Sequence, residues 1–140
     1  MDKDLLLIDL CPRVPYGIKC QVDDGAAGFN DGTLIEIDIS KECVRFEADY
    51  WWVADIDEIK PYLRTMSSMT EEEKREYNLF FFGAEPLTCD FSVYAVEHRT
   101  LYEFDAKNLI DWLNKHYFDY RGLIKKGLAL EAKEGMYKIE

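Results

Sequence analysis

Strict alternation of isoleucine and acidic residues between Thr33 and Ser40 constrains the fold of this chain more than any other feature. On an extended backbone Ile35, Ile37 and Ile39 share one face, while the acidic residues between them share the other. The segment therefore predicts a β-strand with one buried face and one solvated, acidic face.

Four other apolar segments of strand length surround it, at 5–11, 18–22, 43–48 and 50–54. Segment 12–17 contains two prolines and a glycine and predicts a rigid turn, and the polar segment 23–32 predicts a flexible hairpin loop. Sequential short strands predict an antiparallel β meander, or a small barrel or roll, over about residues 1–55.

Helical signals dominate over about residues 56–140. Thr70 and Glu73 form a T-x-x-E capping box, which predicts a helix through about Leu79. The acids of segment 55–59 predict a short helical turn that Pro61 stops, and a β segment is expected near 90–104.

The C-terminal helices carry their own boundary residues. Asp105 is expected to cap a helix through about Lys115, and Asp119 to cap a short helix that Gly127 ends. The apolar face of the first of these helices is expected to hold Leu109, Ile110, Leu113 and Tyr117. The chain thus predicts an α+β fold, a single domain over 1–140, with the N-terminal meander or small barrel packed against C-terminal helices.

Charge is strongly and unevenly negative. The 140 residues carry 28 acids and 17 bases, for a net charge of −11, and residues 1–60 hold 14 of the acids but 6 of the bases. A field of this sign repels phosphate backbones and disfavours direct nucleic-acid binding. It suits a basic protein partner, mimicry of nucleic acid, or simple solubility.

The cysteines match no metal or redox template. Cys11, Cys20, Cys43 and Cys89 contain no C-x-x-C pair, and the glycine-rich loop fits neither a calcium loop nor a phosphate loop. We therefore expect no metal and no cofactor. The sequence also contains no recognisable signal peptide or membrane span, so we expect a cytoplasmic protein with reduced, mostly buried thiols and no membrane partner.

Candidate catalytic groups are sparse. His98 and His116 are the only histidines, and both are distant in sequence from Cys11, Cys20 and Cys43. A small hydrolase with a Cys–His or carboxylate site stays open as an alternative, because folding can bring distant residues together.

Adjacent aromatic residues suggest binding. Trp51 and Trp52 follow one another, so an extended backbone directs one of them away from the core, where it would be an anchor for a protein partner. Phe80, Phe81 and Phe82 raise the same question, because three consecutive side chains cannot all face one core.

Three stretches also resemble a known group of proteins. They contain DLCPRVPYGIKC at 9–20, IKPYLRTMSSMTEEE at 59–73, and DWLN, FDYRGLI and GLALEA between 111 and 132. The combination resembles small uncharacterised proteins from phages, prophages and mobile elements of gut anaerobic bacteria. The resemblance implies a phage or mobile-element setting and a cytoplasmic location, and it implies no activity.

Within these stretches, several polar residues have no obvious packing role. They become candidate binding residues if they converge on one surface, although caps and ion pairs would also explain them. With the two tryptophans, the candidate set is Arg13, Tyr16, Trp51, Trp52, Arg64, Asp119, Tyr120 and Arg121.

The leading hypothesis is a non-enzymatic protein-interaction module whose partner is another protein. It follows from the lack of a catalytic motif, the paired tryptophans and the acidic strand face. An acidic nucleic-acid mimic that inhibits a host or defence protein is the second hypothesis, and the small hydrolase is the third. The oligomeric state stays open.

Overall fold

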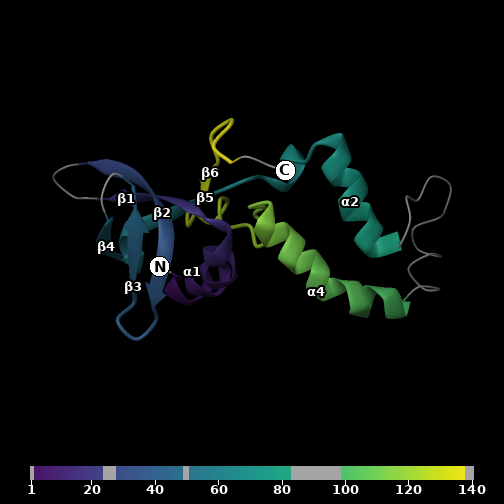
Figure 1. The fold of residues 1–140 in the computed structure, drawn as a ribbon, viewed down its shortest axis with the longest axis horizontal. Helices are drawn as coiled ribbons and strands as arrows, with labels where there is room; N and C mark the ends of the chain where they lie inside the picture. Colours follow the sequence, from purple (N-terminus) through teal and green to yellow (C-terminus); the bar gives the residue numbers. More distant parts are fainter. Residues whose placement is uncertain (1, 24–27, 49–50, 83–98, 138–140) are drawn as a thin grey trace.

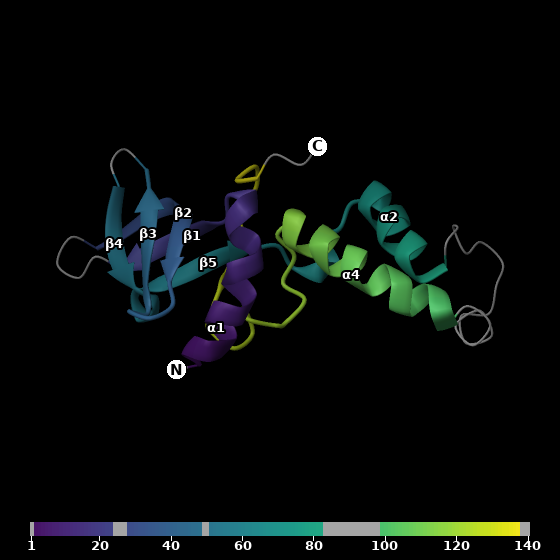
Figure 2. The same ribbon diagram turned by 60° about the horizontal axis from the view of Figure 1, so that its bottom comes forward.

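A computed structural model describes residues 2–23, 28–48, 51–82 and 99–137. Figure 1 shows an elongated molecule, with a β-sheet and helix α1 (Lys3–Leu10) at one end and two helices extending from the other. The two extending helices are α2 (Glu71–Phe82) and α4 (Arg99–Lys115). The second view in Figure 2 shows α1 crossing the sheet, between it and the helical half. The predicted α+β class is confirmed.

The sheet begins as a meander, as predicted. Strands β1 (Lys19–Asp23), β2 (Phe29–Asp38), β3 (Cys43–Glu47) and β4 (Trp51–Asp55) pair antiparallel in chain order. The described strands form an open sheet in the order β4-β3-β2-β1-β5-β6, not a closed barrel.

The short helical turn expected over 55–59 is present, but Pro61 has a different role from the expected one. A 3-10 turn over Ile56–Glu58 leads into strand β5 (Ile59–Leu63), so Pro61 lies inside a strand and does not stop a helical turn there. Strand β5 pairs antiparallel with β1 and parallel with the short β6 (Leu130–Glu131). The pairing with β6 starts after Pro61, at Tyr62, so the missing proline N–H interrupts no bond on that side.

The predicted strand over 5–11 is wrong, because this segment is helix α1. The Asp2 side chain accepts a hydrogen bond from Leu5 N at 3.2 Å and caps the helix. Leucine favours helices, and a short apolar run cannot by itself distinguish a buried helix from a strand. The predicted turn that follows is a 3-10 helix, Cys11–Tyr16, which ends at Gly17 with φ +74°.

Strand β2 forms as predicted, but its inward face differs. The register changes from Leu34 opposite Phe46 to Glu36 opposite Arg45, a bulge that reverses the alternation. Leu34 is therefore buried before the bulge, and Ile37 packs against the core after it. Ile39, expected on the buried face, is 64% exposed because it lies beyond the end of β2, in the turn.

Two apolar clusters hold the molecule together. In the larger cluster Leu6 and Leu10 of α1 pack with sheet residues such as Val44 and Phe46, and all four are 0–1% exposed. The smaller cluster contains Met69, Leu113 and Phe118, with Trp112 against it. The burial of apolar surface between α1 and the sheet supplies the main driving force for this half.

Helix α4 starts earlier than predicted. It begins at Arg99, so residues 99–104 are helical and not a β segment, and Asp105 is inside the helix and is not its cap. The remainder of the expected β segment lies outside the described residues. Leu113 is buried, but Ile110 is 39% exposed and Tyr117 follows the helix with φ +63°. The expected apolar face is therefore only partly formed.

Helix α2 and helix α4 pack as a hairpin. Trp112 Nε1 donates to Glu76 Oε2 at 2.8 Å, and the Phe80 and Tyr77 rings lie 5.9 and 6.2 Å from the Trp112 ring. Phe80 thus meets α4, while the side chains of Phe81 and Phe82 lie outside the described part of the structure. A helix long and apolar enough to cross a membrane is absent from the described residues.

The capping box is confirmed in full. Thr70 N donates to Glu73 Oε1 at 2.9 Å, and Glu73 N donates to Thr70 Oγ1 at 3.1 Å. These reciprocal bonds satisfy backbone donors that would otherwise lack partners at the start of α2.

We expect Thr70→Ala to lower the free energy of unfolding by about 1 kcal/mol, because it leaves the Glu73 N–H without its acceptor. Urea denaturation followed by circular dichroism measures the change. Ser67→Ala is the matched control, because Ser67 is exposed and its hydroxyl only bonds that of Thr65. An equal loss in both variants would contradict the role of the capping box.

Candidate functional site: a buried polar cluster and an apolar surface

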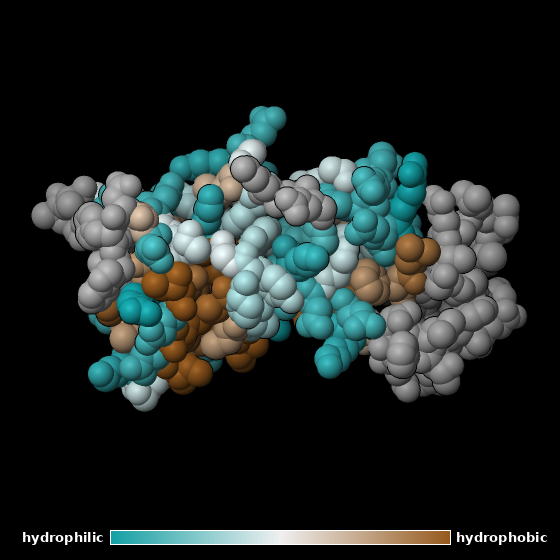
Figure 3. Space-filling view, in the orientation of Figure 1, coloured by the Kyte–Doolittle hydropathy of each residue, from teal (hydrophilic) through white to brown (hydrophobic). Residues whose placement is uncertain are grey.

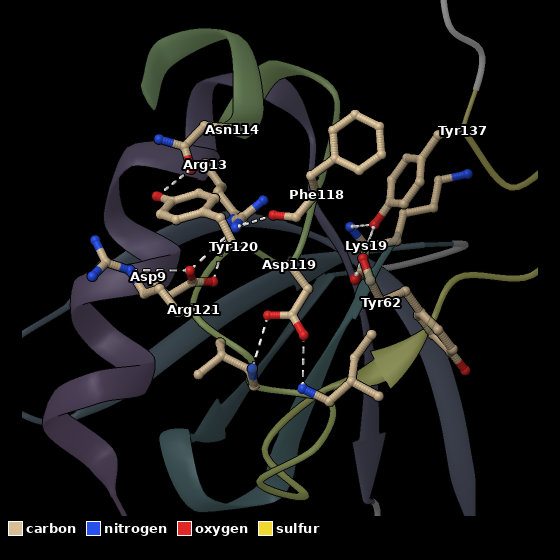
Figure 4. Close-up of polar contacts among 12 residues, drawn as sticks. Asp9, Arg13, Lys19, Tyr62, Asn114, Phe118, Asp119, Tyr120, Arg121 and Tyr137 are labelled. Carbon is tan, nitrogen blue, oxygen red and sulfur yellow. Dashed lines mark hydrogen bonds and ion pairs between the residues drawn. The ribbon is translucent and has the colours of Figure 1, made fainter. Parts of the chain in front are cut away.

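Several of the predicted site residues meet at one place, shown in Figure 4. Arg13, Tyr120 and Arg121 gather around Asp9 of α1, and we call these four residues the Asp9 cluster. Sequence analysis did not select Asp9, because an acid within an apolar run gives no sign of its partners.

The centre of the cluster is a completely buried ion pair. Arg13 Nε lies 3.0 Å from Asp9 Oδ2 and Arg13 Nη2 lies 3.1 Å from Asp9 Oδ1, and both side chains are 0% exposed. Arg13 Nη2 also donates to the Phe118 carbonyl at 2.7 Å. The paired groups thus connect α1 with the segment that follows α4, and they are closed to solvent.

Two further residues complete the cluster. Arg121 Nε lies 3.4 Å from Asp9 Oδ1, and the guanidinium groups of Arg13 and Arg121 lie 5.1 and 5.2 Å from the centre of the Tyr120 ring. The Tyr120 hydroxyl donates to Asn114 Oδ1 at 2.8 Å. Burial raises the pKa of Asp9, and attraction to the two arginines opposes that rise. One carboxylate thus faces two guanidinium groups, and Arg13 Nη1 is buried without a hydrogen-bond partner.

Asp119 has the predicted role of a cap. Its carboxylate oxygens accept hydrogen bonds from Leu123 N at 2.8 Å and Ile124 N at 3.0 Å. The capped segment is a hydrogen-bonded turn that includes Gly127 with φ +77°, and it is not the short helix expected from the sequence. Tyr16 contributes its backbone carbonyl, which accepts a hydrogen bond from the Tyr117 hydroxyl.

Arg64 lies in a second polar centre, which we call the Arg64 junction, with Glu73 and Phe118. Its guanidinium donates to both carboxylate oxygens of Glu73, at 2.8 and 2.7 Å, and lies 4.3 Å from the centre of the Phe118 ring. Arg64 N donates to the Tyr117 carbonyl at 2.7 Å, and Asp119 N donates to the Arg64 carbonyl at 2.8 Å. Arg64 therefore joins β5, α2 and the end of α4.

Glu73 is strongly acidic in this setting. Burial alone would raise its pKa, but hydrogen bonds from Arg64 and Thr70, together with the Arg64 charge, lower the pKa from 4.5 to about 2. The carboxylate is therefore ionised at neutral pH and committed to an internal pair.

The tryptophans are elsewhere on the molecule. The register of β4 places Trp51 opposite Glu47 and Trp52 opposite Phe46, while both side chains lie outside the described residues. The predicted set therefore divides into the Asp9 cluster, the Arg64 junction, the Asp119 cap and strand β4, and does not form one surface.

The structure adds a polar network that sequence analysis missed. Tyr137 stacks on Tyr117 with ring centres 3.7 Å apart, accepts a bond from Lys19 N at 3.0 Å and donates to the Tyr62 carbonyl at 2.8 Å. Burial raises the pKa of the Tyr137 hydroxyl, which keeps it a donor. The network holds the C-terminal segment over β1 and β5, and every contact joins residues distant in sequence.

A pocket of about 250 Å³ lies beside this network, between Arg64, Thr65 and Ser68 and the segment 131–137. Its arginine is already paired with Glu73, and Lys133 bonds Asp31 at 3.2 Å. The two basic groups at its walls are thus engaged with protein partners, while Glu131 and Glu134 also line it.

Histidine and cysteine chemistry finds no support in the described residues. His116 is 7% exposed, its Nδ1 lies 2.9 Å from the Trp112 carbonyl oxygen, and its ring lies 4.4 Å from the Trp112 ring. His98 and Cys89 lie outside the described residues. Cys20 is buried, Cys43 is half-buried and Cys11 is exposed, so the expectation of mostly buried thiols is wrong for Cys11. Across the described chain, no group of histidines, cysteines and acids could hold a metal ion.

One apolar surface of the described residues belongs to α1. Leu5, Leu6, Leu7 and Ile8 are consecutive, so the helix is apolar on all sides, and Ile8 remains 56% exposed. Figure 3 shows hydrophobic atoms gathered over α1 and the adjoining part of the sheet. We call the exposed side of α1, with Ile8 at its centre and Leu5 and Leu7 beside it, the α1 surface.

The fold and these contacts define an α+β protein with an internally paired polar centre and an exposed apolar helix. No protein-family model, curated protein or solved structure matches the chain. The function is therefore inferred from the Asp9 cluster, the Arg64 junction and the α1 surface.

We expect Asp9→Asn to lower the free energy of unfolding by about 3 kcal/mol, because Arg13 stays buried without its carboxylate. The double variant Asp9→Leu with Arg13→Met removes both charges and is expected to recover much of that loss, apart from the bond to the Phe118 carbonyl. Urea denaturation of the three proteins makes the comparison. A double variant no more stable than Asp9→Asn would contradict the ion-pair account.

The low pKa of Glu73 predicts a pH dependence. The stability that it contributes is present above pH 4.5 and is lost as the pH falls toward about 2, where the folded state also becomes protonated. The shift corresponds to roughly 3 kcal/mol. We expect wild type to exceed Glu73→Gln by about that amount at pH 7, with the difference shrinking as the pH approaches 2.

Urea denaturation at a series of pH values measures this difference. Glu71→Gln is the matched control, because the Glu71 side chain is 82% exposed and pairs only with Lys74 in the same helix. A wild-type advantage over Glu73→Gln that stays constant from pH 7 to pH 2 would be inconsistent with the assigned pKa.

Proposed function

We propose that this protein is a non-enzymatic interaction module, and that the α1 surface is where it binds another protein. The exposure of Ile8 on a helix that is apolar on all sides carries the proposal. A helix of this composition is normally covered on every side, so its open side is suited to a partner.

The polar residues predicted as site candidates support this proposal, because they already bind other groups within the protein. Arg13, Arg64 and Asp119 bind within the protein, and their contacts connect segments of the fold. A catalytic site needs polar groups held ready for a substrate, whereas these groups already have protein partners.

The charge around the α1 surface indicates the kind of partner. Asp2 and Asp4 at the start of the helix are exposed, and Lys3 between them binds Glu42 at 3.1 Å and Asp57 at 3.2 Å. The acids outnumber the base, so a partner with apolar residues and a basic rim would be complementary. In keeping with the resemblance noted above, we place this interaction in the cytoplasm of a cell that carries a phage or mobile element.

The acidic-mimic alternative receives less support. A mimic of nucleic acid needs an unbroken row of carboxylates, but several surface acids alternate with bases. Glu36 pairs with Arg45 at 2.8 Å, and Asp31 pairs with Lys133 at 3.2 Å. These pairs reduce the field that a mimic would present.

A capture experiment tests the α1 surface. Tagged wild type, Ile8→Glu and Leu79→Glu are incubated with a host lysate at low and physiological salt, and recovered proteins are identified and tested again in purified form. We expect Ile8→Glu to lose at least tenfold in affinity, because a charge would be buried in the interface. Leu79 is 45% exposed on α2, so its variant controls for surface charge.

Circular dichroism and urea denaturation of the same variants establish that Ile8→Glu remains folded. The assignment of the α1 surface would be refuted if wild type and both variants recovered the same host proteins. It would also be refuted if wild type recovered no specific host protein.

A further inference from the structure

Strand β4 has an open edge. It is the outermost strand, pairs with β3 alone among the described strands, and has no described element beyond it in Figures 1 and 2. Outer strands normally carry lysine, proline or a bulge, or are very short, because their free N–H and C=O groups accept other chains. The opposite edge, β6, has only two residues.

The sequence of β4 contains none of these protective devices. It reads WWVAD, with neither proline nor lysine, and its register with β3 advances one residue at a time without a bulge. Val53 at its centre is 55% exposed. This edge can therefore accept another strand.

The segment that contains β4 is acidic, although Arg45 of β3 lies opposite Val53 and Lys3 of α1 binds Asp57. Between Arg45 and Lys60 the chain contains five acidic residues and no basic one. Asp55 and Glu58 of this stretch are exposed at the end of β4 and just after it. A basic segment would be attracted here, and an acidic one repelled.

A hollow of about 320 Å³ lies beside the edge on the outer face of the sheet. Val53 lines it together with two acids, Glu36 and Asp38, and two bases, Lys41 and Arg45. An added strand would lie about 4.8 Å from β4, and alternate side chains would project over this face. Because Glu36 already pairs with Arg45, the attraction for a basic segment comes from the exposed acids at the end of β4 and just after it, Asp55 and Glu58.

We propose that the edge of β4 binds an extended basic segment of a partner protein by strand addition. Main-chain hydrogen bonds supply the affinity in this binding mode, and alternate side chains supply the selectivity. The proposal rests on the proposed function as an interaction module, and it adds a second contact site with a defined chemistry.

Synthetic peptides test the proposal directly. The probe is the capped heptapeptide Lys-Thr-Lys-Val-Lys-Thr-Lys, titrated into the full chain while backbone amide signals are followed by NMR. Two further peptides carry N-methyl groups on alternate residues. In one peptide the methyl groups remove the N–H donors along one edge of the added strand, and in the other peptide they remove those along the opposite edge. We expect the unmodified peptide to shift the β4 amides, and only one methylated peptide to bind, because one edge of the added strand pairs with β4.

Charge reversal provides the second readout. Asp55→Lys is expected to weaken binding of the unmodified peptide about tenfold, while Ile110→Lys, on α4, is expected to leave it unchanged. Equal binding of both methylated peptides would show attraction by charge alone and would overturn strand addition. An unmodified peptide that shifts no β4 amide signal would also overturn strand addition.

The two proposals fail separately. Ile8→Glu is expected to leave the peptide-induced shifts of the β4 amides unchanged, because Ile8 is not part of β4 and it is Lys3, at the other end of α1, that binds the segment after β4. If the peptide does not bind but capture of a partner still depends on Ile8, strand addition alone is overturned. Peptide binding without Ile8-dependent capture would overturn the α1 surface alone.

Discussion

Arg64 connects three separate parts of the described structure: the end of β5, helix α2 and the segment after α4. Its backbone forms hydrogen bonds in both directions with the segment after α4, and its side chain binds both oxygens of Glu73 and lies against the Phe118 ring. Glu73 in turn completes the capping box of α2. The orientation of the helical hairpin relative to the sheet thus depends on one arginine, whose planar group can bind a carboxylate and an aromatic face together.

The Asp9 cluster serves the same purpose on the other side of this segment. Arg13 binds Asp9 within its own part of the chain and the Phe118 carbonyl of a distant part. Buried ion pairs cost desolvation and often add little net stability, whereas apolar burial drives folding. Their value here lies in geometry, because Arg13 binds the Phe118 carbonyl and Arg64 lies against the Phe118 ring.

Some local signals in the sequence predict the structure correctly, although the expected cap at Asp105 is wrong, and contacts with distant partners are not predictable. The capping box at Thr70 and the cap at Asp119 were predictable, because both bond to residues within five positions. Strand alternation located β2 and β3, yet the bulge at Leu34 depends on how β3 pairs with it. Helix α1 was mistaken for a strand, because an apolar run has no periodicity to measure. The sequence allows the prediction that Arg13 and Arg64 form ion pairs, but it does not identify their partners.

The internal pairing of these charged residues also indicates which surfaces are left to bind a partner. The fold matches its buried charges in pairs, so the net charge of −11 is carried at the surface, and most of it belongs to the β-rich half. That half also has the exposed side of α1 and the open edge of β4. A strongly acidic sheet discourages self-association through its own edge, because a second copy brings the same negative charge. An edge left open to others but closed to itself by charge would select a basic partner, and would need no proline or lysine for protection.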